Sequence, residues 1–163
     1  MAEKRPSKDE YYLDFARAIS KRATCLRRKF GAVIVRDDQI ISCGYCGSPR
    51  GAPNCIDIGK CLRDELKVPS GERYELCRSV HAEANAVINA ARSGVSVLGG
   101  TIYVCGENAE DGETLNDSMP CQMCRRVIIN SGIKRVVVPS EQGTHEYFPK
   151  DWTNGDEVSL NGY

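Results

Sequence analysis

Apolar residues along the chain follow two different spacings. Near the start, the run Ser7-Lys8-Asp9-Glu10 has the spacing of a helix capping box. Apolar residues then recur at helical spacing, at Leu13, Ala16, Ile19 and Ala23. Together these signals predict a helix over residues 9–23.

A strand pattern comes next. Residues 30–35 are largely apolar and β-branched, the pair Asp37-Asp38 supplies a turn, and residues 39–43 return to apolar side chains. This pattern predicts a β-hairpin. Residues 44–74 have little periodicity and are rich in proline and glycine, so we expect a long loop with one short helix over residues 61–66.

The second half of the chain alternates between the two spacings. The predicted elements are a helix over 82–91, a strand over 101–105, a helix over 121–130, a strand over 135–138 and a last strand over 157–160. Alternation of this kind predicts an α/β fold with helices packed on a sheet. The 163 residues fit a single domain, which we expect to span residues 1–163.

The charge balance and composition limit which class of molecule this protein is expected to bind. The 22 Lys and Arg are balanced by 22 Asp and Glu, so no excess positive field exists to attract a polynucleotide. A small, free substrate is the better expectation. Residues 1–20 are dense in charge, and the longest apolar run, residues 32–35, is too short for a bilayer. We therefore expect a soluble, cytoplasmic protein without membrane contact.

Nine cysteines are many for a chain of this length. In a reducing cytosol they favour metal ligation or buried thiols over disulfides. Three groups stand at the starts of two predicted helices, where free amides and the helix dipole stabilise thiolates: His81, Cys121 and Cys124. One imidazole and two thiolates leave the fourth position of a zinc ion open, as in catalytic sites.

Glu83 lies two residues beyond His81 and is placed to act as the base beside such a metal. His-x-Glu followed by Pro-Cys-x-x-Cys is the signature of zinc nucleobase deaminases. Cys-x-x-Cys alone also occurs in redox proteins and structural zinc ribbons. A closed structural zinc would need a fourth protein ligand and would leave Glu83 without a role.

Three segments together resemble the deoxycytidylate deaminase family: the run from Cys77 to Ala86, the loop from Gly44 to Gly51, and the junction of the first helix with Gly31-Ala32-Val33. The resemblance covers roughly residues 9–140. It implies a three-layer α/β/α cytidine-deaminase-like fold with a mixed sheet of about five strands. It also implies hydrolysis of dCMP to dUMP and ammonia, with Glu83 moving the protons, in a homo-oligomer, often a hexamer, regulated by dCTP and dTTP.

Four other cysteines lie in or beside the long loop: Cys25, Cys55, Cys61 and Cys77. Some family members carry a second, structural zinc, and Cys25 and Cys55 resemble two of its ligands. A four-thiolate site would order this loop. The alternative is that all four are buried thiols. Cys43 and Cys105 fall in predicted strands and are expected to be core residues.

The sequence departs from the family in the substrate loop, where Cys46 stands in place of the usual Asn. A thiol is a poor substitute for an amide that can both donate and accept. The connection over residues 106–119 is also longer than usual in the family. The residues predicted to bind substrate or effector are Tyr45, Cys46, Ser48, Arg50 and Arg92. For the two arginines, a solvated surface position is the alternative.

Three functions remain open at this point. The first is deamination of a free deoxycytidine nucleotide, most readily dCMP. The second is the same chemistry on another nucleobase, nucleotide or base-like metabolite, which Cys46 permits. The third is a zinc-binding regulatory module without turnover, which the intact Glu83 argues against.

Overall fold

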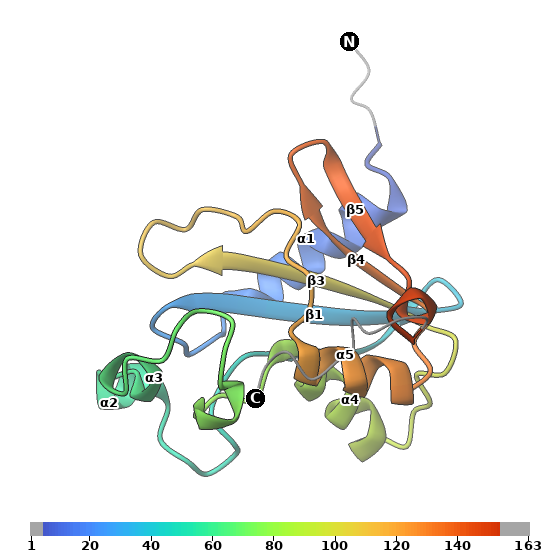
Figure 1. The fold of residues 1–163 in the computed structure, drawn as a ribbon. Helices are drawn as coiled ribbons and strands as arrows, with labels where there is room; N and C mark the ends of the chain where they lie inside the picture. The colour runs from blue at the N-terminus through green and yellow to red at the C-terminus, as the bar shows by residue number, and fades with distance from the viewer. Residues whose placement is uncertain (1–4, 154–163) are drawn as a thin grey trace.

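A mixed sheet of five strands lies at the centre of the molecule, in the order β2-β1-β3-β4-β5 (Figure 1). The structure is a computed structural model and describes residues 5–153. The strands are β1 (Arg28–Arg36), β2 (Gln39–Tyr45), β3 (Thr101–Asn108), β4 (Arg135–Ser140) and β5 (Gly143–Tyr147). β3 and β4 run parallel, and the other neighbouring pairs are antiparallel.

Helices cover both faces of the sheet (Figure 1). α1 (Lys8–Ser20) packs on one face, in a core that includes Leu13 and Ala16. α4 (Ala82–Arg92) and α5 (Gln122–Asn130) pack on the other face, in a second core. The expected α/β class and three-layer arrangement are therefore confirmed.

The position of β1 in the middle layer explains why its sequence is a continuous apolar run. Ala32 and Ile34 point toward α4 and α5, whereas Val33 and Val35 point toward α1. When helices cover both faces of a sheet, the side chains that point to either face of a strand are buried. The turn into β2 is made by two residues with positive φ, Asp37 and Asp38, as the sequence predicted.

The capping box at the start of α1 is confirmed. The Ser7 hydroxyl accepts a hydrogen bond from the amide of Glu10, and the Glu10 carboxylate accepts one from the amide of Ser7. The helix ends at Ser20 rather than at Ala23. Ala23 is nevertheless buried, which explains why it continued the apolar pattern.

The long loop contains three short helices: α2 (Cys55–Ile58), α3 (Leu62–Glu65) and η1 (Tyr74–Leu76). α3 matches the short helix expected near residues 61–66. Arg63 of α3 is buried and donates hydrogen bonds to the carbonyl oxygens of Pro69 and Glu72. A buried arginine thus fastens this loop from inside.

β5 is the strand that the sequence pattern missed, and α2, η1 and η2 (Pro149–Thr153) are short helices that it also did not predict. The strand predicted over 157–160 lies outside the described residues. η2 follows β5 and buries Trp152 against the α4 and α5 core. None of the helices within residues 5–153 is both long enough and apolar enough to cross a membrane.

α4 is fixed closely against β2, which sets the position of the site. A Cβ atom on Gly44 would lie 2.4 Å from the backbone nitrogen of Ala86, so only glycine permits this approach. Two helix side chains add hydrogen bonds to β2 carbonyls. The Asn85 amide donates to Tyr45 at 2.8 Å, and the Asn89 amide donates to Cys43 at 2.7 Å.

Candidate active site

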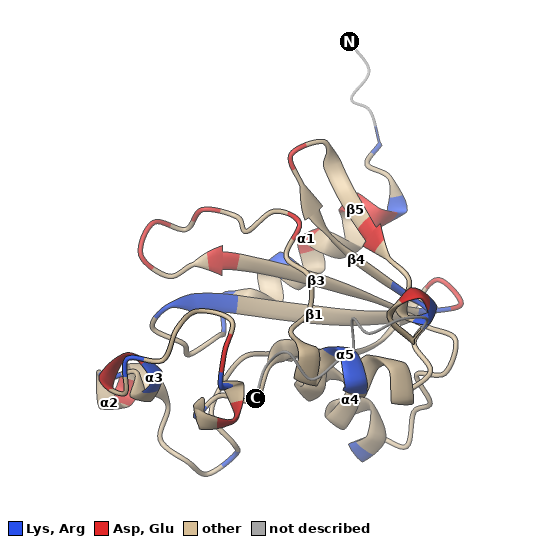
Figure 2. Cartoon of the chain, viewed as in Figure 1, with Lys and Arg blue, Asp and Glu red and all other residues tan. Residues whose placement is uncertain are grey.

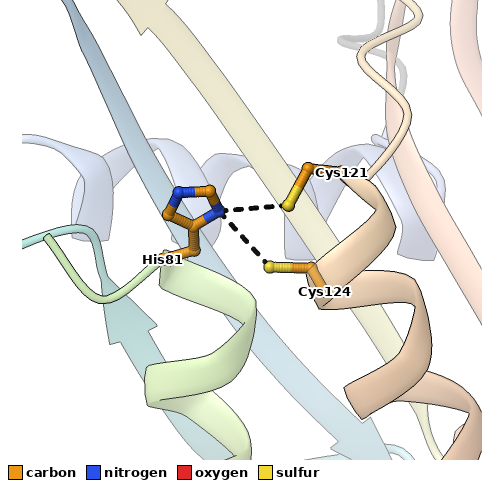
Figure 3. A group of neighbouring side chains, drawn as sticks. All are labelled: His81, Cys121 and Cys124. Atoms are coloured by element: carbon orange, nitrogen blue, oxygen red, sulfur yellow. Dashed lines mark hydrogen bonds between the residues drawn. The ribbon is translucent and has the colours of Figure 1, made fainter. Parts of the chain in front are cut away.

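Three metal-ligand side chains meet between the N-termini of α4 and α5 (Figure 3). His81 and Cys121 are the N-cap residues of the two helices, and Cys124 lies in the first turn of α5. The Nδ1 atom of His81 lies 3.3 Å from the Sγ of Cys121 and 3.4 Å from the Sγ of Cys124. All three donor atoms lie within 4.8 Å of one another.

The donor set fits zinc. Tetrahedral zinc with ordinary Zn–N and Zn–S bonds places such donor atoms about 3.6 Å apart, close to the separations found here. The hydrogen bond from Cys124 and the neighbouring His81 imidazole lower the pKa of the Cys121 thiol, which favours the thiolate that a metal ion binds. A histidine and two cysteines supply three ligands, and no further histidine, cysteine or carboxylate of residues 5–153 joins the group.

Glu83 lies in the first turn of α4, beside the metal ligands. Its side chain is only 6% exposed. Burial raises the pKa of its carboxyl, while the nearby His81 acts in the opposite direction. Glu83 therefore lies beside the His81 group, where a buried carboxyl can take up and release a proton; its catalytic role stays a prediction.

Two of the metal ligands, His81 and Cys121, line a cavity of about 590 Å³ together with Glu83, whereas Cys124 is not among the lining residues. Its walls come from the start of β1, the loop that contains α3 and η1, the N-termini of α4 and α5, and residues 118–120. A cavity of this size suits a ligand as large as a nucleotide.

Of the residues predicted to bind substrate or effector, Cys46 lines this cavity. Tyr45, Ser48, Arg50 and Arg92 are not among the lining residues. Arg50 turns instead to α4, where its Nη2 donates to Asn89 Oδ1 at 2.6 Å. The predicted role of Ser48 and Arg50 in substrate binding therefore has no support from this cavity, and the predicted role of Arg92 in effector binding stays a prediction.

Cys46 is held by the backbone of β1. Its Sγ accepts a hydrogen bond from the amide of Phe30 at 3.3 Å and donates one to the carbonyl oxygen of Arg28 at 3.5 Å. Burial raises the pKa of the thiol to about 12, so it is neutral. Cys46 thus joins the end of β2 to the start of β1 at the cavity wall.

The cysteines proposed for a second zinc site lie near one another but do not form a ligand group. Cys25, Cys61 and Cys77 line the cavity, and Cys55 is buried outside its lining. No three of these four sulfurs lie within 4.8 Å of one another, since the His81 group is the one such cluster in residues 5–153. A second zinc stays a prediction. Cys105 is a core residue, as expected, and Cys43 packs against the same core.

Sequence reasoning missed several residues of the cavity wall. Tyr74 stands edge-on to His81, with ring centroids 5.1 Å apart, and the guanidinium of Arg63 lies 4.6 Å from the Tyr74 ring centre. Phe30 and Arg28 reach the cavity from β1. Nothing in the loop sequence marks Tyr74, because η1 is too short to have a periodic pattern.

The connection over residues 106–119 forms a rim beside the site. It folds back on itself through a bridge between Glu107 and Thr114, and it ends at the cavity-lining Ser118 and Met119. Asp117 ties this rim to β5, because its carboxylate lies 2.8 Å from Nδ1 of His145. The sequence offered no partner for His145.

Comparison with known proteins agrees with this geometry. Residues 6–140 match the family described as the cytidine and deoxycytidylate deaminase zinc-binding region. The chain belongs to this family. The match takes in the three ligands and Glu83, and it confirms the prediction of a zinc cofactor.

Individual members of the family are similar over most of the chain. The deoxycytidylate deaminase of Mycobacterium phage D29 is 38% identical over 141 residues, covering 84% of this chain and 98% of the phage protein. The deoxycytidylate deaminase of Schizosaccharomyces pombe is 37% identical over 133 residues, which are 82% of this chain but 37% of the yeast protein. This chain thus spans well under half of the yeast relative.

The fold is also similar to that of a solved dCMP deaminase. The dCMP deaminase of cyanophage S-TIM5, in its apo form, is 25% identical and superposes with a TM-score of 0.59, covering 84% of this chain and 86% of that chain. The same enzyme in complex with dCMP and dUMP superposes with a TM-score of 0.58.

Proposed function

We propose that this protein hydrolyses dCMP to dUMP and ammonia. The observation that carries the proposal is the buried carboxyl of Glu83 beside an open three-ligand group at the inner end of a nucleotide-sized cavity. The similarity to deoxycytidylate deaminases over most of the chain supports dCMP as the substrate.

His81, Cys121 and Cys124 would hold the zinc ion. When bound there, zinc supplies Lewis-acid chemistry that makes water a nucleophile near neutral pH. Hydrolysis adds water at C4 of the cytosine ring and expels ammonia, so one group must accept a proton from the water and deliver protons to ring N3 and the leaving amine. Glu83, buried beside the metal ligands and in the lining of the cavity, is placed to be that group.

The geometry disfavours the other two functions. A regulatory module has no need of a buried carboxyl at an open metal position, because burying it costs folding free energy. In the sequence, Cys46 in place of the usual Asn was the reason to consider a substrate with another nucleobase. However, the Cys46 thiol is engaged by Phe30 and Arg28 of β1. Cys46 therefore has a structural role in joining β2 to β1. Its presence does not imply that the substrate carries a nucleobase other than cytosine.

We extend the proposal to a cytoplasmic homo-oligomer, with dCTP and dTTP as effectors and a single free nucleotide as substrate. Its support is the family resemblance together with apolar side chains on the outer face of α1. Tyr11 and Phe15 are 48% and 39% exposed there, with ring centroids 5.0 Å apart. A second subunit would cover such a pair.

Ammonia release tests the function directly. Purified, zinc-loaded protein should release ammonia from dCMP when screened beside dCTP, deoxycytidine, CMP and purine nucleotides. Glu83→Gln should retain zinc, because none of the ligands changes, and should lose turnover by at least about a hundredfold. Zinc content is measured by elemental analysis and turnover by ammonia release. Undiminished turnover in Glu83→Gln would rule out the proton-transfer role.

A further inference from the structure

The His81 imidazole receives little orientation from the helix that it begins. Its backbone is extended, with φ −70° and ψ 155°, and its side chain makes no capping hydrogen bond to α4. Both cysteine sulfurs lie on its Nδ1 side, so a rotation of the ring would move that nitrogen away from Cys121 and Cys124 (Figure 3). Contacts around a metal ligand hold its ring in place, and their loss typically costs about tenfold to a hundredfold in metal affinity or activity.

Tyr74 makes such a contact with His81. The two rings stand at 86° to each other, with their centroids 5.1 Å apart. This edge-to-face arrangement is one that aromatic rings prefer. Tyr74 is half-buried and lines the cavity beside His81. Within residues 5–153 the Tyr74 hydroxyl has no hydrogen-bond partner, so the contact with His81 depends on the ring.

Arg63 holds the Tyr74 ring in place. Its guanidinium carbon lies 4.6 Å from the centre of that ring, within the range of a cation–π interaction. The same guanidinium donates to the carbonyl oxygens of Pro69 at 2.9 Å and Glu72 at 2.6 Å, which braces the turn that leads to Tyr74. Arg63 is only 7% exposed, and a cation–π interaction is stronger when the cation is withdrawn from water.

The other charged residues of this loop are arranged differently. Figure 2 shows basic and acidic residues intermixed around α3 and η1. Arg73, for example, pairs with Glu75 at the exposed surface. Among the residues that the structure describes, no carboxylate lies within salt-bridge distance of Arg63. Burying a cation costs free energy unless it is well bonded, and the groups that bind this one are two loop carbonyls and the Tyr74 ring.

We propose that Tyr74 is a positioning residue for the metal ligand His81, and that Arg63 fixes Tyr74 through the cation–π contact. The three side chains connect the long loop to the metal site, so the affinity for zinc depends on the order of this loop. The expected effect on turnover rests on the proposed deaminase function. The expected effect on zinc binding does not depend on any substrate.

Two substitutions of Tyr74 test the role of its ring. In Tyr74→Leu, which lacks the ring, the Kd for zinc should rise about tenfold to a hundredfold in competition with a chelator. The visible absorption spectrum of the Co²⁺-loaded variant should change, because this spectrum reports the geometry of the ligands. At saturating zinc, kcat for dCMP should fall while KM changes little. Tyr74→Phe keeps the ring and should retain the parent values. The zinc followed is the ion that His81→Ala fails to bind.

Arg63→Lys tests the second contact. It keeps the charge but removes the planar guanidinium that lies over the ring. It should weaken zinc binding less than Tyr74→Leu does. In a Tyr74→Leu background it should add nothing, because Arg63 acts through Tyr74. An equal loss of zinc affinity in both backgrounds would contradict this order of action.

Phe30→Leu is the matched control for Tyr74→Leu. Phe30 is an aromatic residue of the same cavity wall, and among the described residues no ring contact joins it to His81. Its Kd for zinc should equal that of the parent protein. An unchanged Kd in Tyr74→Leu, an equal rise in Phe30→Leu, or a rise of KM alone in Tyr74→Leu would overturn the inference.

Urea unfolding of the zinc-free proteins shows whether each variant keeps its fold. If Tyr74→Leu does not fold, Tyr74→Met takes its place, because methionine fills a similar space without a ring. Failure of the deaminase function has a different signature. Unmodified protein that binds zinc but releases no ammonia from dCMP would contradict that function, while the zinc affinities of the variants would still decide the role of Tyr74.

Discussion

Phe30 owes its place in the cavity wall to the residue that faces it across the sheet. Phe30 on β1 pairs in register with Gly106 on β3. A Cβ atom built on Gly106 would lie 2.2 Å from Cε1 of Phe30, so the ring occupies the space that a side chain at position 106 would need. Phe30 can therefore occupy this place in the cavity wall because residue 106 is a glycine.

Gly106→Ala should displace this ring. Because the clash is with a ring packed on the α4 and α5 core, we expect the free energy of unfolding to fall by about 1–3 kcal/mol. Phe30→Val should remove the clash, so that adding Gly106→Ala to it costs much less. Urea unfolding of the four proteins in this cycle gives the coupling free energy. Equal costs of Gly106→Ala in both backgrounds would mean that the ring is not the obstacle.

At the scale of elements, α1 is held to the sheet by a partly buried polar contact as well as by its apolar face. Asp9 accepts hydrogen bonds from Arg135 of β4 at 3.0 and 2.6 Å and from the hydroxyl of Tyr103 of β3 at 2.8 Å. The start of the helix is thereby joined to two strands. Arg135 also donates to Glu146 of β5, which continues the connection to the sheet edge.

This contact predicts a pH dependence of stability. The Arg135 hydrogen bonds hold the pKa of Asp9 below its ordinary value of 3.8, although partial burial acts the other way. A carboxyl with a lowered folded-state pKa stabilises fully above its unfolded pKa, and this stabilisation is lost as pH falls through the folded value. Asp9→Asn should therefore lower the free energy of unfolding by about 1–3 kcal/mol at about pH 7 and by much less at about pH 3.

Asp14→Asn on the same helix is the control for Asp9→Asn. Asp14 pairs with Arg17 at the exposed surface, where one ion pair contributes less than about 1 kcal/mol. Urea titrations of both variants across the acid range make the comparison. A constant difference between Asp9→Asn and the parent protein at all pH values would show that charge is not the cause.

The elements also show where sequence patterns succeed and fail. The hairpin, α4, β3, α5 and β4 were predicted because each has a buried, periodic face. β5 was missed because it is an exposed edge strand, Gly-Thr-His-Glu-Tyr, whose only structural signal is its pairing with β4. The metal ligands were found because their spacing is local, whereas Arg28, Phe30 and Tyr74 become cavity residues only through tertiary packing.

For the whole molecule, the sheet order determines where chemistry can occur. Placing β3 beside β4 in parallel brings the helices that precede each strand, α4 and α5, side by side, with their N-termini at one end. His81, Cys121 and Cys124 therefore converge although 40 residues separate the first from the second. The same arrangement makes the metal a link between two helices, so that its binding and the stability of the fold are coupled.

Metal removal tests this coupling. A ligand that binds only the folded chain stabilises it by about 2.7 kcal/mol at a hundredfold excess over its Kd, which corresponds to roughly 5–10 °C in Tm for a chain of this size. Chelation should lower Tm by such an amount, and zinc should restore it. His81→Ala should show little further response to the chelator if its cluster is the one zinc site. A chelator response that persists in His81→Ala, with one zinc still bound per chain, would instead locate a second ion among Cys25, Cys55, Cys61 and Cys77.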